Sequence, residues 1–177
     1  MALGSDLADN PAAMKLLLVR HAAAVPRGTP GVADDDRPLT PDGRKKFEVA
    51  AKGLARIADR PDVLLTSPLP RAKATAEIAA RAFRRIEPRT EPALAHNSVE
   101  EIIVALQKVS SAETVAMVGH EPVLSAVLAH LLEASDAARL AFKKGGAALV
   151  DLPNGPKAPG RLLWFLKPRI LRALGGD

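Results

Sequence analysis

The sequence has no cysteine among its 177 residues. Disulfide bonds, thiolate nucleophiles and cysteine-ligated zinc are therefore excluded, and this is compatible with a reducing compartment, so we expect a cytoplasmic protein. Aromatic residues are also scarce, with four Phe, one Trp and no Tyr. The core must then consist of Ala, Leu, Val and Ile, which suits helices packed on a sheet. Single-stranded nucleic acid would find few rings to stack on.

Long hydrophobic runs are missing as well. The longest, at residues 123–132, is interrupted by Ser125 and His130, whereas a membrane span needs about 20 apolar residues. Residues 1–13 lack the basic start and the apolar centre of a signal peptide. We expect these thirteen residues to be a disordered extension, followed by one domain at residues 14–177.

Positive charge is concentrated near the C-terminus. The chain carries a net charge of +5, yet residues 139–177 hold eight Lys or Arg and two acidic residues, while residues 1–138 are close to neutral. One interpretation is a solvated, cationic last helix. The other is a surface that attracts an anionic protein partner or lipid headgroups. We do not expect nucleic-acid binding, because no recognised reading motif accompanies the charge.

Short apolar runs alternate with segments of helical spacing along the chain. The run at residues 15–19 is typical of a buried parallel strand, and Thr40 followed by Pro41 is typical of a helix start. Two last strands are expected at residues 146–152 and 161–166, before a basic tail. The alternation predicts a single-domain α/β fold, a three-layer sandwich whose mainly parallel central sheet carries helices on both faces.

Reactive side chains follow three of the predicted strands. Arg20 and His21 follow the first strand, Ser67 follows the second, and His120 follows a strand at residues 114–118. Ligands of parallel sheets bind at the carboxyl ends of the strands. We therefore expect these residues to share one site.

Two predicted helix starts indicate that this site binds an anion. A helix expected from Pro122 follows His120 directly, and its N-terminus offers free N–H groups. Arg71 falls in the first turn of another helix, where a cation opposes the helix dipole unless a bound anion offsets the cost. Arg20 and Arg71 could each hold an oxyanion with two nitrogens. A phosphate pocket without a metal is predicted, because the acidic run at residues 34–36 lies in a long loop and is expected to be solvated.

Four motifs resemble those of the histidine phosphatase superfamily and, within it, the short SixA-type phosphohistidine phosphatases. They are LLLVRHA at residues 16–22, RPLTPDG at 37–43, LLTSPLPRAKATA at 64–76 and VGHEP at 118–122. The resemblance covers residues 14–166 and implies a minimal phosphoglycerate mutase-like fold. The phosphoglycerate mutase branch itself fits less well, because the chain leaves little room for the helical insertions usual there.

The resemblance also implies a role for each matching residue. His21 is the expected nucleophile, which would carry the phosphoryl group as a covalent phosphohistidine. Arg20 and Arg71 would hold the phosphoryl oxygens, and His120 would donate hydrogen bonds to them. Arg37 would add a contact from the loop. No cofactor and no metal are expected.

One part of the family pattern has no clear counterpart. Larger enzymes of the superfamily use a carboxylic acid to protonate the leaving oxygen, and the sequence offers four candidates without deciding among them: Asp35, Glu91, Glu100 and Glu101. The residues after His21 are Ala22, Ala23 and Ala24, where many members have Gly and an acidic residue. A missing acid favours a phosphohistidine substrate, because an imidazole leaving group can carry its own proton near neutral pH.

Three functions remain open on the sequence. The first is a phosphatase for phosphohistidine on a protein, such as a phosphorelay domain. The second is a phosphatase for a small metabolite, such as a sugar phosphate. The third is a phosphate-binding or scaffolding module that docks partners through its basic C-terminal segment. Peripheral membrane contact by residues 162–174 is a further possibility that the sequence does not decide.

Overall fold

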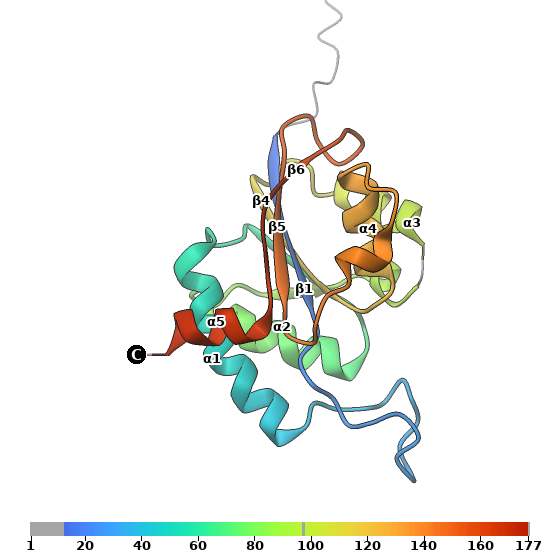
Figure 1. Ribbon diagram of the computed structural model, residues 1–177, viewed down its shortest axis with the longest axis vertical. Helices are drawn as coiled ribbons and strands as arrows, with labels where there is room; N and C mark the ends of the chain where they lie inside the picture. Colours follow the sequence, from blue (N-terminus) through green and yellow to red (C-terminus); the bar gives the residue numbers. More distant parts are fainter. Residues whose placement is uncertain (1–12, 97, 177) are drawn as a thin grey trace, which may run out of the picture.

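The computed structural model describes residues 13–96 and 98–176. The predicted extension therefore lies outside the described residues, apart from Ala13. Six strands form one mixed sheet in the order β3-β2-β4-β1-β5-β6 (Figure 1). They are β1 (Met14–Arg20), β2 (Val63–Thr66), β3 (Pro88–Thr90), β4 (Thr114–Gly119), β5 (Ala147–Leu152) and β6 (Arg161–Leu166).

The sheet is parallel in one part and antiparallel in the other. Strand β1 pairs in parallel with β4, and β2 pairs in parallel with both β4 and β3. Strand β5 runs antiparallel to both β1 and β6. The turn at residues 153–160 contains no crossover helix, so the two last strands form an antiparallel hairpin. The predicted mainly parallel sheet is confirmed, and β1, β2 and β4 end at the same edge.

Helices cover both faces of the sheet, which confirms the predicted three layers (Figure 1). One face carries α1 (Pro41–Ile57), α2 (Pro70–Ala82) and α5 (Pro168–Gly175), and the other carries α3 (Val99–Gln107) and α4 (Val123–Leu131). Two short 3₁₀ helices, η1 (Pro92–Ala95) and η2 (Ala137–Leu140), complete the second layer. No helix in the described residues is long and apolar enough to span a membrane.

Strand β1 lies at the centre of the sheet and separates two apolar cores. Leu16 and Leu18 point into the core under α3 and α4, whereas Leu17 and Val19 point into the core under α1, α2 and α5. Successive strand side chains face opposite ways, so an unbroken apolar run is what a strand between two helical layers requires. All four residues are essentially inaccessible to solvent.

Most predicted element boundaries agree with the structure. Thr40 caps α1 by accepting a 2.9 Å hydrogen bond from the Gly43 amide. Strand β3 is only three residues long and follows Ile86, which is buried in the core. Helix α4 begins at Val123, with Pro122 as its N-cap.

The basic C-terminal segment is a packed element rather than a free tail. Helix α5 crosses α1 so closely that a Cβ on Gly53 would lie 2.0 Å from the Leu171 carbonyl oxygen. A Cβ on Gly175 would lie 1.9 Å from the Val49 carbonyl oxygen. Leu171 is fully buried in this contact. The expectation of a solvated last helix is therefore correct for the charged side of α5 only.

Candidate active site

The ends of β1, β2 and β4 bring the predicted residues together. The His21 amide donates to the Gly119 carbonyl at 3.0 Å, and the Ser67 amide donates to the Val118 carbonyl at 3.0 Å. These bonds continue the sheet ladder past the last strand residues. As a result, the His21 and His120 rings lie with their centroids 5.0 Å apart.

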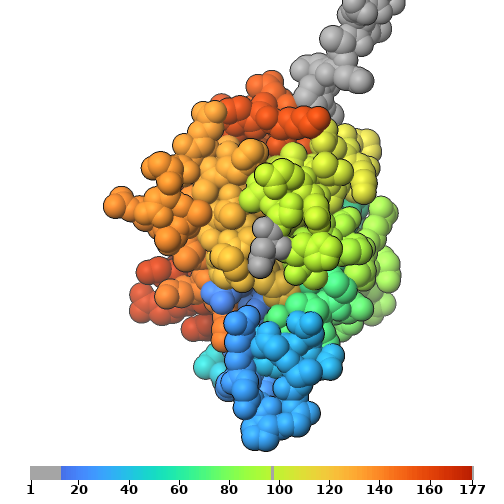
Figure 2. Space-filling view, turned by 90° about the vertical axis from the view of Figure 1, so that its right-hand side faces the viewer, coloured from blue at the N-terminus to red at the C-terminus, as the bar shows by residue number. Residues whose placement is uncertain are grey.

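A polar cavity of about 320 Å³ opens over these strand ends. The loop at residues 22–39 protrudes beside it, at the lower end of the molecule in Figure 2. All five predicted site residues line the cavity, together with four that the sequence analysis did not single out. The lining consists of Arg20, His21, Pro26, Arg27, Arg37, Arg71, His120, Glu121 and Lys144.

His21 is held as a neutral imidazole with one nitrogen available. Its side chain is buried, and its Nδ1 lies 2.7 Å from the Ala22 carbonyl oxygen. A carbonyl can only accept, so Nδ1 carries the hydrogen and Nε2 keeps its lone pair. Burial lowers the pKa of His21 to about 3, and the positive charges of Arg71 and Arg20 act in the same direction. The ring is therefore unprotonated at neutral pH.

His120 is oriented by a serine at the end of the neighbouring strand. Its Nε2 lies 2.8 Å from the Ser67 hydroxyl, which also accepts a 3.3 Å hydrogen bond from the Leu69 amide. The buried Ser67 hydroxyl hydrogen needs an acceptor, and His120 Nε2 supplies it, so Nδ1 of His120 carries the ring hydrogen. Burial lowers the pKa of His120 to about 4, helped by the charges of Arg71, Arg20 and Arg37.

Three arginines are desolvated around the two imidazoles. Arg20 donates to the Phe142 carbonyl, and Arg71 Nη1 donates to the Asp34 carbonyl at 3.0 Å. Burial lowers the pKa of Arg20 and of Arg71 below the ordinary arginine value. Both remain cations at any physiological pH. Arg37 is only 5% exposed, so three guanidinium groups are confined to one pocket.

Three nitrogens of this pocket are buried and have no hydrogen-bond partner. They are Nε of Arg20, Nε of Arg71 and Nδ1 of His120, and they are the unpartnered buried side-chain nitrogen and oxygen atoms found in the described part of the chain. Leaving a buried donor unpaired costs about 1–3 kcal/mol. All three nitrogens belong to residues that line the same cavity. Their shared location indicates a site that binds a hydrogen-bond acceptor.

Asp34 connects the long loop to the arginines. Its carboxylate accepts a hydrogen bond from Nε of Arg37 at 2.9 Å and forms an ion pair with Arg27 at 3.2 Å. Its backbone carbonyl accepts a hydrogen bond from Nη1 of Arg71. The acidic run at residues 34–36 was expected to be solvated, and Asp34 is exposed, but its pairing with Arg27 and Arg37 was not expected. The sequence pattern gives no sign of this role, because it depends on how the loop folds back over α2.

None of the four candidate acids lines the cavity. Glu91 caps η1 through the Ala93 amide at 3.0 Å, Glu101 lies 2.7 Å from His96, and Glu100 accepts from Ser98. Asp35 is exposed on the loop.

The carboxylate that does line the cavity belongs to Glu121. Its oxygens accept from the Phe142 amide at 2.8 Å and from the Ser125 hydroxyl at 2.6 Å. In the described residues, no three His, Asp or Glu side chains come together as they would to hold a metal ion.

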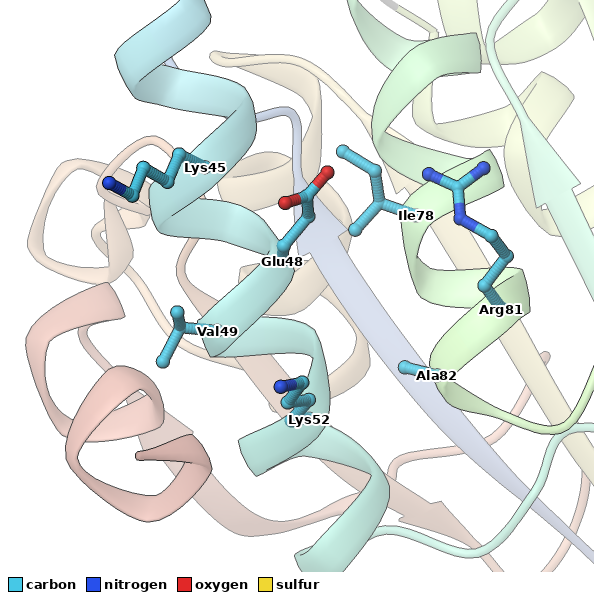
Figure 3. A pocket seen from close by; sticks show the side chains of 7 residues that line it. All are labelled: Lys45, Glu48, Val49, Lys52, Ile78, Arg81 and Ala82. Carbon is cyan, nitrogen blue, oxygen red and sulfur yellow. The ribbon is translucent and has the colours of Figure 1, made fainter. Parts of the chain in front are cut away.

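A larger groove of about 480 Å³ lies elsewhere, between α1 and α2 (Figure 3). Ile78 and Ala82 line it from α2, and Glu48 points into the space between the two helices. Lys52 and Arg81 add positive charge at its rim. None of the strand-end residues lines this groove, so it is separate from the cavity over the strand ends.

Comparison with known proteins identifies the family to which the chain belongs. The model of the histidine phosphatase superfamily, branch 1, matches residues 16–99. An uncharacterized protein of Picosynechococcus sp. (strain PCC 7002) is 32% identical over 145 residues, which cover 80% of this chain and 86% of that protein.

Solved structures agree with this match. The protein of Agrobacterium tumefaciens assigned as the phosphohistidine phosphatase SixA is 28% identical, with a TM-score of 0.75 over 88% of this chain and 98% of that one. The corresponding protein of Nakamurella multipartitia is 27% identical, with a TM-score of 0.72 over 90% and 99% of the two chains. A protein histidine phosphatase SixA complexed with tungstate, 23% identical, shares the fold with a TM-score of 0.78 over 89% and 99%. The chain belongs to the histidine phosphatase superfamily.

Proposed function

We propose that this protein removes the phosphoryl group from phosphohistidine on another protein, through a covalent intermediate on His21. The phosphatase chemistry follows from the family and its phosphatase neighbours. The protein substrate and the roles of individual residues are our proposal. The neighbours assigned as phosphohistidine phosphatases, at 27% and 28% identity, support the substrate class.

The observation that carries the proposal is the state of His21. Its Nδ1 hydrogen is committed to the Ala22 carbonyl, so the lone pair of Nε2 is free to attack phosphorus. A low pKa keeps that lone pair unprotonated at neutral pH. A neutral, oriented imidazole is a competent nucleophile without a separate base.

The first chemical step transfers the phosphoryl group. His21 Nε2 forms a bond to phosphorus while the bond from phosphorus to the substrate nitrogen breaks, and the leaving nitrogen takes up a proton. Charge on the three equatorial oxygens is stabilised by the guanidinium groups of Arg20 and Arg71 and by Nδ1–H of His120. Their unpartnered nitrogens are donors that such oxygens would satisfy.

The second step returns the enzyme to its starting state. Water attacks phosphorus, the bond to His21 Nε2 breaks, and inorganic phosphate leaves. Arg37 contributes a further positive charge from the loop, although two of its nitrogens already donate to Asp34 and to the Val25 carbonyl. We assign Arg37 to substrate binding rather than to the phosphoryl transfer itself.

The carboxylates around the site support phosphohistidine over an ester. An alkyl phosphate needs an acid to protonate its leaving oxygen, whereas an imidazole accepts a proton from water or carries its own. Both oxygens of Glu121 are occupied by structural hydrogen bonds, and the four acids considered from the sequence lie away from the cavity.

A cytoplasmic location remains a prediction.

The test compares two substrate classes on one enzyme. Purified protein is mixed with a synthetic phosphohistidine peptide and, separately, with a panel of phosphate esters that includes sugar phosphates. Chelator is present throughout, and His21→Ala is assayed in parallel. We expect phosphate release from the phosphohistidine peptide, little release from the esters, and loss of turnover in His21→Ala.

Two other results would redirect the assignment. Fast ester turnover that depends on His21 would make the protein a phosphatase of small metabolites. No His21-dependent release from any substrate would leave a phosphate-binding or scaffolding module.

A further inference from the structure

A second, smaller cavity of about 60 Å³ lies beside the catalytic cavity. Its wall includes Ala22, the residue next to the nucleophile, and Lys144 lines both cavities. Two more basic side chains line it, Lys46 from α1 and Arg172 from α5. We call Lys46, Lys144 and Arg172 the cationic flank. It extends the positive charge of the catalytic pocket onto the outer surface.

Lys144 is fixed relative to the nucleophile. The Gly145 amide donates to the Arg20 and His21 carbonyls, each at 3.1 Å, and the Arg20 amide donates to the Gly146 carbonyl at 3.0 Å. Gly145 has a positive φ of 76°, a backbone conformation that favours glycine. The loop that carries Lys144 is therefore tied by backbone hydrogen bonds to the end of β1.

Arg172 is also held by a rigid contact. It follows the buried Leu171 on α5, and this helix crosses α1 at the close approach of Gly53 and Gly175. The α1–α5 contact brings the basic C-terminal segment back to the flank of the active site. Part of the positive charge concentrated at residues 139–177 therefore lies beside the active site.

The cationic flank is only partly neutralised. Lys46 pairs with Asp42 at 2.7 Å, across an exposed turn of α1. No ion pair joins Lys144 or Arg172 to a carboxylate among residues 13–96 and 98–176. Positive charge without a counterion on a rigid surface attracts an anionic partner and accelerates its encounter.

We propose that the cationic flank docks acidic side chains of the protein that carries the phosphohistidine. This inference rests on the proposed function and narrows its substrate to an acidic phosphoprotein. The phosphorylated residue enters the catalytic cavity, while carboxylates a few residues away contact Lys46, Lys144 and Arg172. The flank then selects a protein over a small phosphate compound, which fills the catalytic cavity without reaching Arg172.

The fold favours a protein over a lipid surface as the partner. A helix that lies on a membrane inserts its apolar face among the acyl chains. Leu171, on the apolar side of α5, is instead fully buried against α1. Ile170 is the large apolar side chain of this helix that is exposed, at 41%, and one such residue beside the cationic side chains leaves no apolar face to insert.

The test uses two synthetic phosphohistidine peptides and one small compound. The first peptide has glutamates on both sides of the phosphohistidine, and the second has glutamines at the same positions. The small compound is N-phosphorylimidazole, which reports the chemistry alone. The double variant Lys46→Gln with Arg172→Gln removes two charges of the flank without touching a residue that lines the catalytic cavity.

The groove between α1 and α2 supplies the matched control. Lys52→Gln with Arg81→Gln removes the same number of charges there (Figure 3). We expect the flank variant to lose about five- to tenfold in kcat/KM for the glutamate peptide, the size expected of two exposed ion pairs. It should keep wild-type turnover of N-phosphorylimidazole, and the control variant should keep both activities. The preference for the glutamate peptide should also shrink as salt is added, since exposed charges are screened over about 8 Å at physiological ionic strength.

Several outcomes would overturn the docking proposal and leave the proposed function intact. Equal turnover of the two peptides by the wild type is one, and an equal loss in the flank and control variants is another. A third is sedimentation of the wild type with anionic phosphatidylserine vesicles but no preference between the peptides, which would assign the flank to a membrane. The proposed function itself would fail if the wild type released phosphate from neither peptide nor from N-phosphorylimidazole.

Discussion

The imidazole rings of His21 and His120 lie with their centroids 5.0 Å apart and their planes inclined by 53°. Two protonated rings at this separation would repel each other in a pocket that already holds three arginines. Burial and these charges lower the pKa of His21 to about 3 and that of His120 to about 4. Both rings are therefore kept neutral, His21 with a free lone pair on Nε2 and His120 with its hydrogen on Nδ1.

The first prediction concerns the protonation of these two rings. With the pocket empty, nitrogen-detected NMR should show both imidazoles neutral from pH 8 down to about 5, because their pKa values of about 3 and about 4 lie below this range. An unperturbed histidine would instead become protonated around its pKa of about 6.5. His21 should show its hydrogen on Nδ1, as the Ala22 contact requires. A titration midpoint of either ring near the ordinary histidine pKa would contradict the account of the site.

The second prediction is a pH dependence of stability. In the unfolded chain His120 regains its ordinary pKa of about 6.5, whereas in the folded protein its pKa is about 4. Between these values the unfolded state binds more protons, so the free energy of unfolding is highest above about pH 6.5 and decreases as pH falls. Urea denaturation should show a smaller decrease for His120→Gln than for the wild type. If the free energy of unfolding decreased equally with pH in the two proteins, this would count against a buried neutral His120.

The third prediction tests how Ser67 positions His120. Ser67→Ala removes the 2.8 Å contact to Nε2 and frees the ring to take the other tautomer. We expect kcat to fall by about two- to tenfold, the effect of one buried hydrogen bond, with the protein still folded. Ser98→Ala is the control, because it removes the cap of α3 and should lower the free energy of unfolding by about 1 kcal/mol without changing kcat. An unchanged kcat in Ser67→Ala would show that the tautomer of His120 does not matter.

The fourth prediction concerns the crossing of α1 and α5. A Cβ on Gly53 would lie 2.0 Å from a backbone oxygen of α5, which cannot move aside without shifting the helix. Gly53→Ala should therefore lower the free energy of unfolding by about 1–3 kcal/mol, the usual cost of overpacking. Gly176→Ala is the control, since its Cβ would meet nothing closer than 3.4 Å. Urea denaturation of both variants measures the difference, and equal stabilities would mean that the helices do not need this close approach.

The sequence was sufficient to predict the residues at the strand ends. An apolar strand followed by Arg20-His21, and another followed by Gly119-His120, could be interpreted because parallel strands present their carboxyl ends at one edge. These inferences depend on local patterns, which the sequence displays directly.

Other features depend on contacts between distant segments and left no local pattern. Asp34 holds Arg37 and Arg71 only because the long loop folds back over α2. Lys144 reaches the catalytic cavity because the Gly145 amide is bonded to the end of β1. For the C-terminal helix, the sequence analysis predicted the positive charge but not the packing against α1. The close backbone contact at Gly175 could not be inferred from composition.

The central claim is that the phosphoryl group passes through His21. The most direct measurement mixes the enzyme with a radiolabelled phosphohistidine peptide, stops the reaction in alkali within milliseconds, and locates the label by mass spectrometry. We predict an acid-labile phosphoramidate on His21 Nε2 that forms and decays as inorganic phosphate appears, and that is absent in His21→Ala. Wild-type turnover with no label on His21, or turnover that persists in His21→Ala, would contradict the account.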